Sequence, residues 1–65
     1  MQAPDAKKIL EAARFNKATI YDYQLSYDMP DGRTISVVRS SQLFSKKDIE
    51  EMLVEAVQEA YAELN

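Results

Sequence analysis

The sequence contains no cysteine, no histidine and no tryptophan, and its 65 residues include one glycine and two prolines. The absence of cysteine excludes disulfide bonds, and the absence of both cysteine and histidine excludes the common zinc sites. A domain of about 60 residues buries only ~60% of its unfolded surface, so small chains usually need such supports or a partner. We therefore expect this chain to depend on close packing or on oligomerisation.

Long apolar segments are also absent. No apolar run approaches the ~20 residues that a membrane-spanning helix needs. The first residues, MQAPDAKK, contain no apolar core of signal-peptide length. These absences predict a cytoplasmic protein with no membrane partner.

Charge is distributed unevenly along the chain, whose formal net charge is −3. All eight Lys and Arg lie within residues 1–47, together with five carboxylates, whereas residues 48–65 hold six carboxylates and no base. Most charge runs form a solvated surface. The same polarity also permits head-to-tail self-association or the binding of a basic partner.

The clearest predicted element is a helix between Ser45 and Leu64. Ser45 is an N-cap residue type with Asp48 three positions later, which is the spacing of a capping box. Apolar residues then recur with helical period, at Ile49, Met52, Leu53, Ala56, Val57, Ala60, Tyr61 and Leu64.

A β-hairpin is predicted before this helix. In residues 18–29, polar positions alternate with the apolar residues Tyr21, Tyr23, Leu25, Tyr27 and Met29. The tripeptide Pro30-Asp31-Gly32 predicts a three-residue turn with Gly32 at positive φ, followed by a return strand over residues 33–40. This turn pairs Met29 with Arg33, Tyr27 with Ile35 and Leu25 with Val37, so that apolar residues face apolar ones.

The remaining segments complete the predicted fold. Residues 4–15 suggest a short helix that ends near Arg14, after which Phe15 and Asn16 turn back toward the core. Residues 41–44 form a link whose Leu43 and Phe44 are expected in the core. The sequence thus predicts an α+β fold: a single small α-β-β-α domain over residues 1–65, with an antiparallel β-hairpin packed against two helices.

Few residues are candidates for catalysis or metal binding. Without His or Cys, general acid–base chemistry near neutral pH would require a carboxylate or lysine with a strongly shifted pKa. Asp28 and Asp31 flank the turn, but the segment MPDGRT lacks the alternating acids and closing Glu of a calcium loop. We therefore expect a protein that is not an enzyme and has no catalytic residues, no cofactor and no metal site.

Nucleic-acid binding is the next class to consider. Tyr21, Tyr23 and Tyr27 offer stacking surfaces, and Arg33 and Arg39 lie on the neighbouring predicted strand. The same tyrosines, however, occupy the face that must form the core, where Tyr23 and Arg39 can form a cation–π pair. The sequence favours this core role, and weak single-strand binding is the third-ranked interpretation.

The last helix has a wide apolar surface, which covers about 200° of its circumference at about 100° per residue. Packing on one small sheet requires roughly half of that. Either the first helix covers the second side, or another molecule does. The marginal size of the chain favours another molecule, and the predicted interface consists of Val54, Val57, Tyr61 and Leu64.

The rest of this helix surface is an acidic ridge, defined as Glu51, Glu55 and Glu59, which are spaced four residues apart. We predict a non-enzymatic protein-interaction module that forms a homodimer through its C-terminal helix. One alternative is an acidic inhibitor or nucleic-acid mimic that presents this ridge to a basic partner. Another is a phage accessory or structural protein.

The phage alternative comes from the order of the elements. Helix–hairpin–helix order at this length, with an Asp31-Gly32-Arg33 turn, is similar to that of the small head-to-tail joining protein of lambda-like phages. The hairpin here is longer, and a loop precedes the last helix. The resemblance is therefore one of element order, and what it implies about function is analogy.

Overall fold

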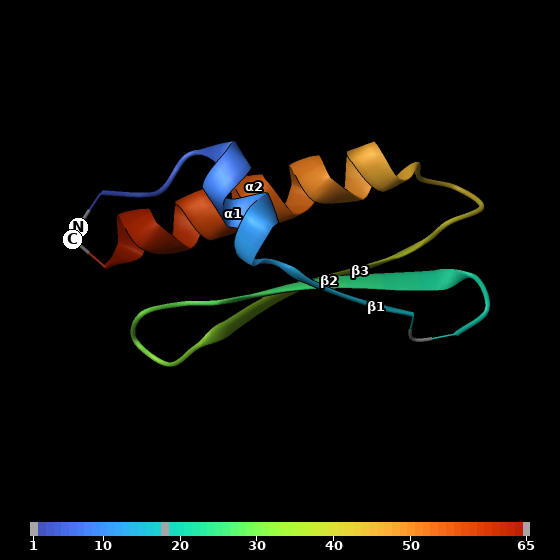
Figure 1. Ribbon diagram of the computed structural model, residues 1–65, viewed down its shortest axis with the longest axis horizontal. Coiled ribbons are helices and arrows are strands. Elements are labelled where there is room, and N and C mark those ends of the chain that lie inside the picture. The colour runs from blue at the N-terminus through green and yellow to red at the C-terminus, as the bar shows by residue number, and fades with distance from the viewer. Residues whose placement is uncertain (1, 18, 65) are drawn as a thin grey trace.

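The computed structural model describes residues 2–17 and 19–64. In chain order the elements are α1 (Ala6–Ala12), β1 (Arg14–Lys17), β2 (Asp22–Asp28), β3 (Thr34–Ser40) and α2 (Lys46–Glu63). The three strands form one antiparallel sheet in the order β1-β2-β3, and both helices lie on the same face of it (Figure 1). The predicted α+β fold, with an antiparallel hairpin packed against two helices, is confirmed.

The β2–β3 hairpin has the predicted register. Leu25 pairs with Val37, and the Met29 N–H donates to the Arg33 carbonyl with an N–O distance of 2.7 Å. Gly32 has a φ of 95°, as predicted, and its N–H donates to the Met29 carbonyl. A three-residue loop with a left-handed glycine matches the twist of the flanking strands, which is why the turn fixes the pairing.

Strand β1 is an element that the sequence did not predict. Helix α1 ends at Ala12 rather than near Arg14, and the chain then enters the sheet, where Phe15 pairs with Leu25. The expectation that Phe15 turns into the core is wrong, because its side chain is 51% exposed. Pairing with β2 gives hydrogen-bond partners to backbone N–H and C=O groups of these residues. It also places the Phe15 ring edge-on to the Tyr23 ring, with centroids 5.1 Å apart.

The core lies between the helices and the sheet. Its buried side chains come from both layers: Ile9, Leu25, Met29, Val37, Ile49, Leu53, Val57, Ala60 and Tyr61. Ile9 is fully buried and is the one core residue of α1. A seven-residue helix is not stable alone in water, so burial of Ile9, which contributes about 1.5–3 kcal/mol, is what docks α1.

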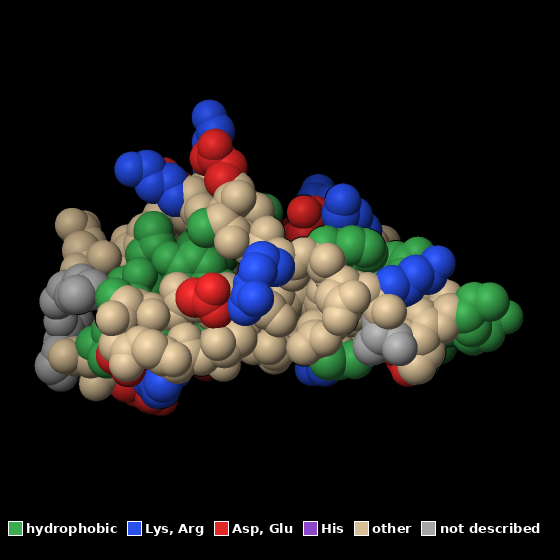
Figure 2. Space-filling view, turned by 60° about the horizontal axis from the view of Figure 1, so that its bottom comes forward, with side chains coloured by type: hydrophobic (Ala, Val, Ile, Leu, Met, Phe, Trp, Pro, Cys, Tyr) green, Lys and Arg blue, Asp and Glu red, His purple; other side chains and the backbone are tan. Residues whose placement is uncertain are grey.

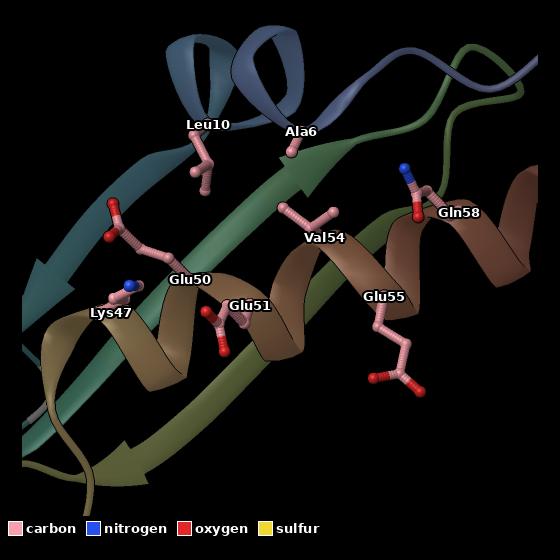
Figure 3. A pocket seen from close by; sticks show the side chains of 8 residues that line it. All are labelled: Ala6, Leu10, Lys47, Glu50, Glu51, Val54, Glu55 and Gln58. Atoms are coloured by element: carbon pink, nitrogen blue, oxygen red, sulfur yellow. The ribbon is translucent and has the colours of Figure 1, made fainter.

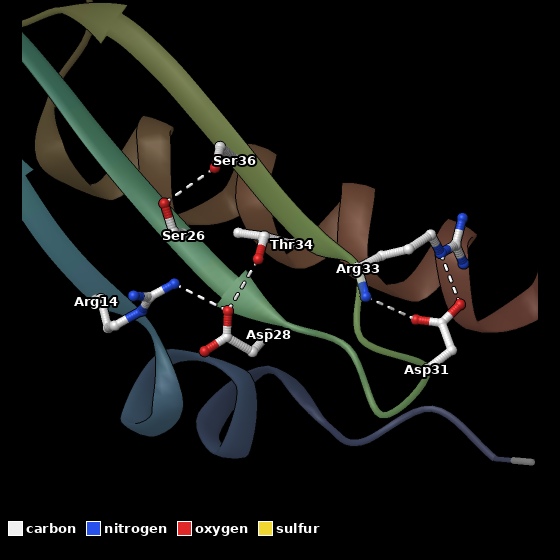
Figure 4. Close-up of polar contacts among 7 residues, drawn as sticks. All are labelled: Arg14, Ser26, Asp28, Asp31, Arg33, Thr34 and Ser36. Atoms are coloured by element: carbon white, nitrogen blue, oxygen red, sulfur yellow. Dashed lines mark hydrogen bonds and ion pairs between the residues drawn. The ribbon is translucent and has the colours of Figure 1, made fainter.

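The opposite face of the sheet is polar (Figure 4). The Arg14 guanidinium donates to the Asp28 carboxylate at 2.8 Å, and the Thr34 hydroxyl donates to the same carboxylate at 3.0 Å. The hydroxyl oxygens of Ser26 and Ser36 lie 3.0 Å apart on paired residues. Exposed contacts of this kind contribute little to the stability of the fold. They show that this face of the sheet is solvated, as is common for antiparallel sheets.

Helix α2 begins as predicted. The Asp48 N–H donates to the Ser45 hydroxyl at 3.1 Å, and the Ser45 N–H donates to the Asp48 carboxylate at 3.2 Å, which completes the capping box. Phe44 is half-buried against the core, but Leu43, expected there too, is 79% exposed. The N–H groups of both residues donate to the Ser40 carbonyl. In a turn this tight, only one of two neighbouring side chains faces the core.

Candidate functional site

The interface predicted on α2 is only partly available to another molecule. Val57 and Tyr61 are buried in the core of the chain itself, and Leu64 is half-buried against that core. In this structure both side chains therefore pack inside the chain and leave almost no surface for a partner to contact. Helix α1 and the sheet together cover more of α2 than the sheet alone would, and the Tyr61 hydroxyl lies 3.2 Å from that of Tyr27 on β2. Val54 is half-buried, on the side of α2 that faces α1.

A groove of about 740 Å³ runs between α1 and α2 (Figure 3). Leu10 and Ala6 point from α1 toward Val54 on α2, and these three side chains form its apolar floor. Leu10 follows the buried Ile9, so it projects from the adjacent side of α1. Helix α1 has seven residues and α2 has 18, so α1 covers only part of α2 and leaves the groove open.

The rim of the groove is mainly acidic. Glu50, Glu51 and Glu55 line it, together with the single cation Lys47. Glu50 and Glu51 lie one turn before Val54 and share its face of α2, whereas Glu55 follows Val54 directly in the chain. The groove thus combines an apolar floor with a net negative rim.

The acidic ridge overlaps this groove only in part. Glu51, Glu55 and Glu59 are all exposed, but only Glu51 and Glu55 line the groove. The ridge was visible in the sequence because its spacing is local to one helix. The groove was not, because it depends on where α1 docks.

The aromatic residues considered for nucleic-acid stacking take different positions. Tyr23 and Tyr27 are half-buried against the core, whereas Tyr21 is exposed. The predicted Tyr23–Arg39 cation–π pair is replaced by one with β1, where the Lys17 ammonium lies 5.8 Å from the Tyr23 ring centroid. The Arg39 guanidinium instead donates to the Val38 carbonyl at 2.8 Å. Tyr23 has a different cationic partner than predicted because β1, which the sequence did not predict, places Lys17 opposite it.

The pKa values of Tyr27 and Asp31 are shifted from their usual values, and neither residue lines the groove. The hydrogen bond with Tyr61, and then burial, raise the pKa of Tyr27. The N–H of Arg33 lowers the pKa of Asp31, with a smaller contribution from the Arg33 side chain. Within residues 2–17 and 19–64, no group of three or more carboxylates is arranged to hold a metal ion. No helix in that part of the chain is both long and apolar enough to cross a membrane.

Comparison with known proteins gives no relative: no protein-family model matches the sequence, and no curated protein or solved structure is significantly similar to it. The groove between α1 and α2 is therefore interpreted from its own geometry and charge.

Proposed function

We propose that this chain is a small, non-enzymatic protein-interaction module whose α1–α2 groove binds a protein surface that presents apolar side chains flanked by basic ones. One observation carries the proposal: the apolar residues Leu10 and Val54 line the same groove as Glu50, Glu51 and Glu55. Such a groove matches the apolar-core, polar-rim pattern of protein interfaces.

The floor and the rim have different roles in this proposal. Covering the floor removes apolar surface from water, which contributes about 25 cal/mol per Å² to binding before the ordering costs. The rim carboxylates speed the encounter with a basic partner and disfavour an acidic one. The floor thus supplies affinity, and the rim supplies selectivity.

The alternative of an acidic inhibitor uses part of the same surface. Glu51 and Glu55 belong both to the acidic ridge and to the groove, whereas Glu59 belongs to the ridge alone. The affinity of a ligand that contacts only the ridge would depend equally on Glu55 and Glu59. A ligand in the groove would depend on Glu55 and on Val54.

This difference defines the experiment. A fluorescein-labelled amphipathic peptide of Leu and Lys residues is titrated with the protein at low ionic strength, and binding is followed by fluorescence anisotropy. We expect saturable binding that weakens about two- to five-fold in Glu55→Gln, the range for one exposed charge pair. Glu59→Gln, which removes the same charge one turn away, serves as the matched control and should bind like the wild type.

The apolar floor is tested with Val54→Lys, whose long side chain can extend its ammonium into water without unfolding the helix. This variant should bind the peptide at least ten-fold more weakly, with an unchanged circular dichroism spectrum. Absence of saturable binding by the wild type would overturn the proposal. Equal losses in Glu55→Gln and Glu59→Gln would favour the acidic-ridge alternative instead.

A further inference from the structure

A second surface, outside the core, presents large apolar side chains to water. We call it the apolar tip and define it as Ile20, Tyr21 and Leu43, which are 72%, 49% and 79% exposed. Ile20 and Tyr21 belong to the β1–β2 connection and Leu43 to the β3–α2 connection, and both connections lie at the same end of the molecule (Figure 1). Hydrophobic side chains project at this end in the space-filling view (Figure 2).

Hydrogen bonds join the described residues of the two connections. The Ser41 N–H donates to the Tyr21 carbonyl at 2.6 Å, which joins one connection to the other. The Thr19 hydroxyl accepts from the N–H groups of Tyr21 and Asp22 at 3.3 and 3.0 Å. The tip is therefore a preorganised surface, and binding through it requires little further ordering of the backbone.

Two cations belong to the elements from which the tip extends. Lys17 precedes the β1–β2 connection and Lys46 follows the β3–α2 connection, and both are exposed. The Lys46 ammonium lies 5.8 Å from the centroid of the Phe15 ring, so β1 and the start of α2 meet at this end. Of the two carboxylates nearby, Asp22 is half-buried and Asp48 is engaged in the capping box.

We infer that the apolar tip of one copy binds the α1–α2 groove of a second copy, so that the chain self-associates head to tail. The inference rests on the proposed function, because it names the partner that the groove accepts. The groove takes apolar side chains flanked by cations, and the tip with Lys17 and Lys46 is such a surface on this same chain. The charges are complementary: the rim carries Glu50, Glu51 and Glu55.

The geometry of this contact differs from a twofold dimer. Tip and groove are different surfaces of a molecule with dimensions of 37 × 19 × 18 Å, so a pair held by a single tip–groove contact keeps one tip and one groove free. Heterologous contacts of this kind give rings if the rotation closes and open chains if it does not. The wild type is therefore expected to grow beyond a dimer as its concentration rises.

A mixing experiment tests the inference. The tip variant Ile20→Ser/Leu43→Ser keeps its groove, and the groove variant Val54→Lys keeps its tip. Each variant alone should sediment as a monomer, because one half of every contact is missing. An equimolar mixture should form a 1:1 dimer and nothing larger, because only one competent tip–groove pair remains. The matched control Val38→Ser changes an exposed apolar residue on the polar face of the sheet and should associate like the wild type.

Two results would overturn the inference. They are a wild type that stays monomeric at several hundred micromolar, and a mixture that fails to form the 1:1 complex although both variants show the wild-type circular dichroism spectrum. If the Leu/Lys peptide still binds the groove in those cases, the proposed function stands and only the choice of partner fails. If the inference is correct, the peptide should also dissociate the wild-type assemblies.

Discussion

Val54 and Val57 lie three residues apart on α2 but belong to different surfaces. Val57 is fully buried in the core, whereas Val54 is half-exposed on the floor of the groove. An ionised side chain in the core has no partner, and an uncompensated buried charge is strongly destabilising. Substitutions at Val57 therefore test the stability of the fold, and substitutions at Val54 test the function of the groove.

We predict that Val57→Glu unfolds the protein or lowers its free energy of unfolding by on the order of 3–5 kcal/mol. Val54→Lys should change that free energy by less than about 1 kcal/mol, because its side chain reaches water. Urea unfolding followed by circular dichroism measures both values. A Val57→Glu protein with the wild-type midpoint would mean that Val57 is not in the core.

Gly32 is the residue on which the hairpin turn depends. Its φ of 95° is strained for any residue with a Cβ, yet a Cβ built there meets no atom within 4 Å. The effect of Gly32→Ala should therefore be backbone strain alone, a loss of about 1–2 kcal/mol in the free energy of unfolding. Gly32→Asn should lose less, because Asn tolerates left-handed conformations. Equal urea midpoints for all three proteins would contradict this account of the turn.

Asp31 links the same turn to pH. Its pKa is lowered from 3.8, mainly because its carboxylate accepts the Arg33 N–H at 3.1 Å. A carboxyl group with a lowered pKa in the folded state contributes stability that is present above its unfolded pKa and is lost as the pH falls through its folded pKa. Asp31→Asn should therefore flatten the loss of stability below about pH 4, with little change in slope near neutrality. Urea titrations between pH 2 and 7, with Glu59→Gln as the control, test this prediction. The same loss of stability below about pH 4 in Asp31→Asn and in the wild type would contradict it.

At the scale of elements, the hairpin and α2 could be predicted because their signals are local. A turn such as Pro30-Asp31-Gly32 and a capping box such as Ser45 with Asp48 require particular residues at fixed spacings. Strand β1 has no such signal: its four residues, RFNK, are exposed and form a strand only because β2 offers a partner. The early end of α1 at Ala12 follows from the same tertiary pairing.

The cap of α2 gives a prediction for that element. Ser45→Ala removes the acceptor of the Asp48 N–H and should lower the free energy of unfolding by about 0.5–2 kcal/mol. Ser45→Asp, which restores an acceptor at the N-cap, should recover most of the loss. Chemical denaturation of the three proteins measures the difference, and an alanine variant as stable as the wild type would show that the box adds nothing.

At the scale of the molecule, the candidate site was only half visible in the sequence. The acidic ridge was predicted, but the apolar floor joins Leu10 and Val54, which are far apart in the chain. The apolar tip was missed for a related reason. Leu43 is a large apolar residue beside a predicted helix and was assigned to the core, and only the tight turn after β3 shows that it projects into water.

The uneven charge of the molecule should make its stability and its association respond to salt in opposite directions. Helix α2 carries six carboxylates, and its only two cations, Lys46 and Lys47, are at its start. Exposed carboxylates spaced four residues apart repel each other, and salt screens this repulsion, since the Debye length falls from about 30 Å at 0.01 M to about 3 Å at 1 M. The exposed ion pairs of Arg14 with Asp28 and Arg33 with Asp31 contribute too little to reverse the effect.

We therefore predict that the melting temperature at low micromolar protein rises between 10 mM and 500 mM NaCl (both round figures, about a fifty-fold range of salt, over which the Debye length falls about seven-fold). Glu59→Lys, which places a cation between Glu55 and Glu63, should start higher and rise less. Sedimentation at high protein concentration over the same range should show weaker association, because the tip and the groove carry opposite charges. A melting temperature that falls with salt would mean that ion pairs outweigh repulsion within the monomer. Association that strengthens with salt would mean that apolar contact alone holds the copies together, and the acidic rim would then have no part in choosing the partner.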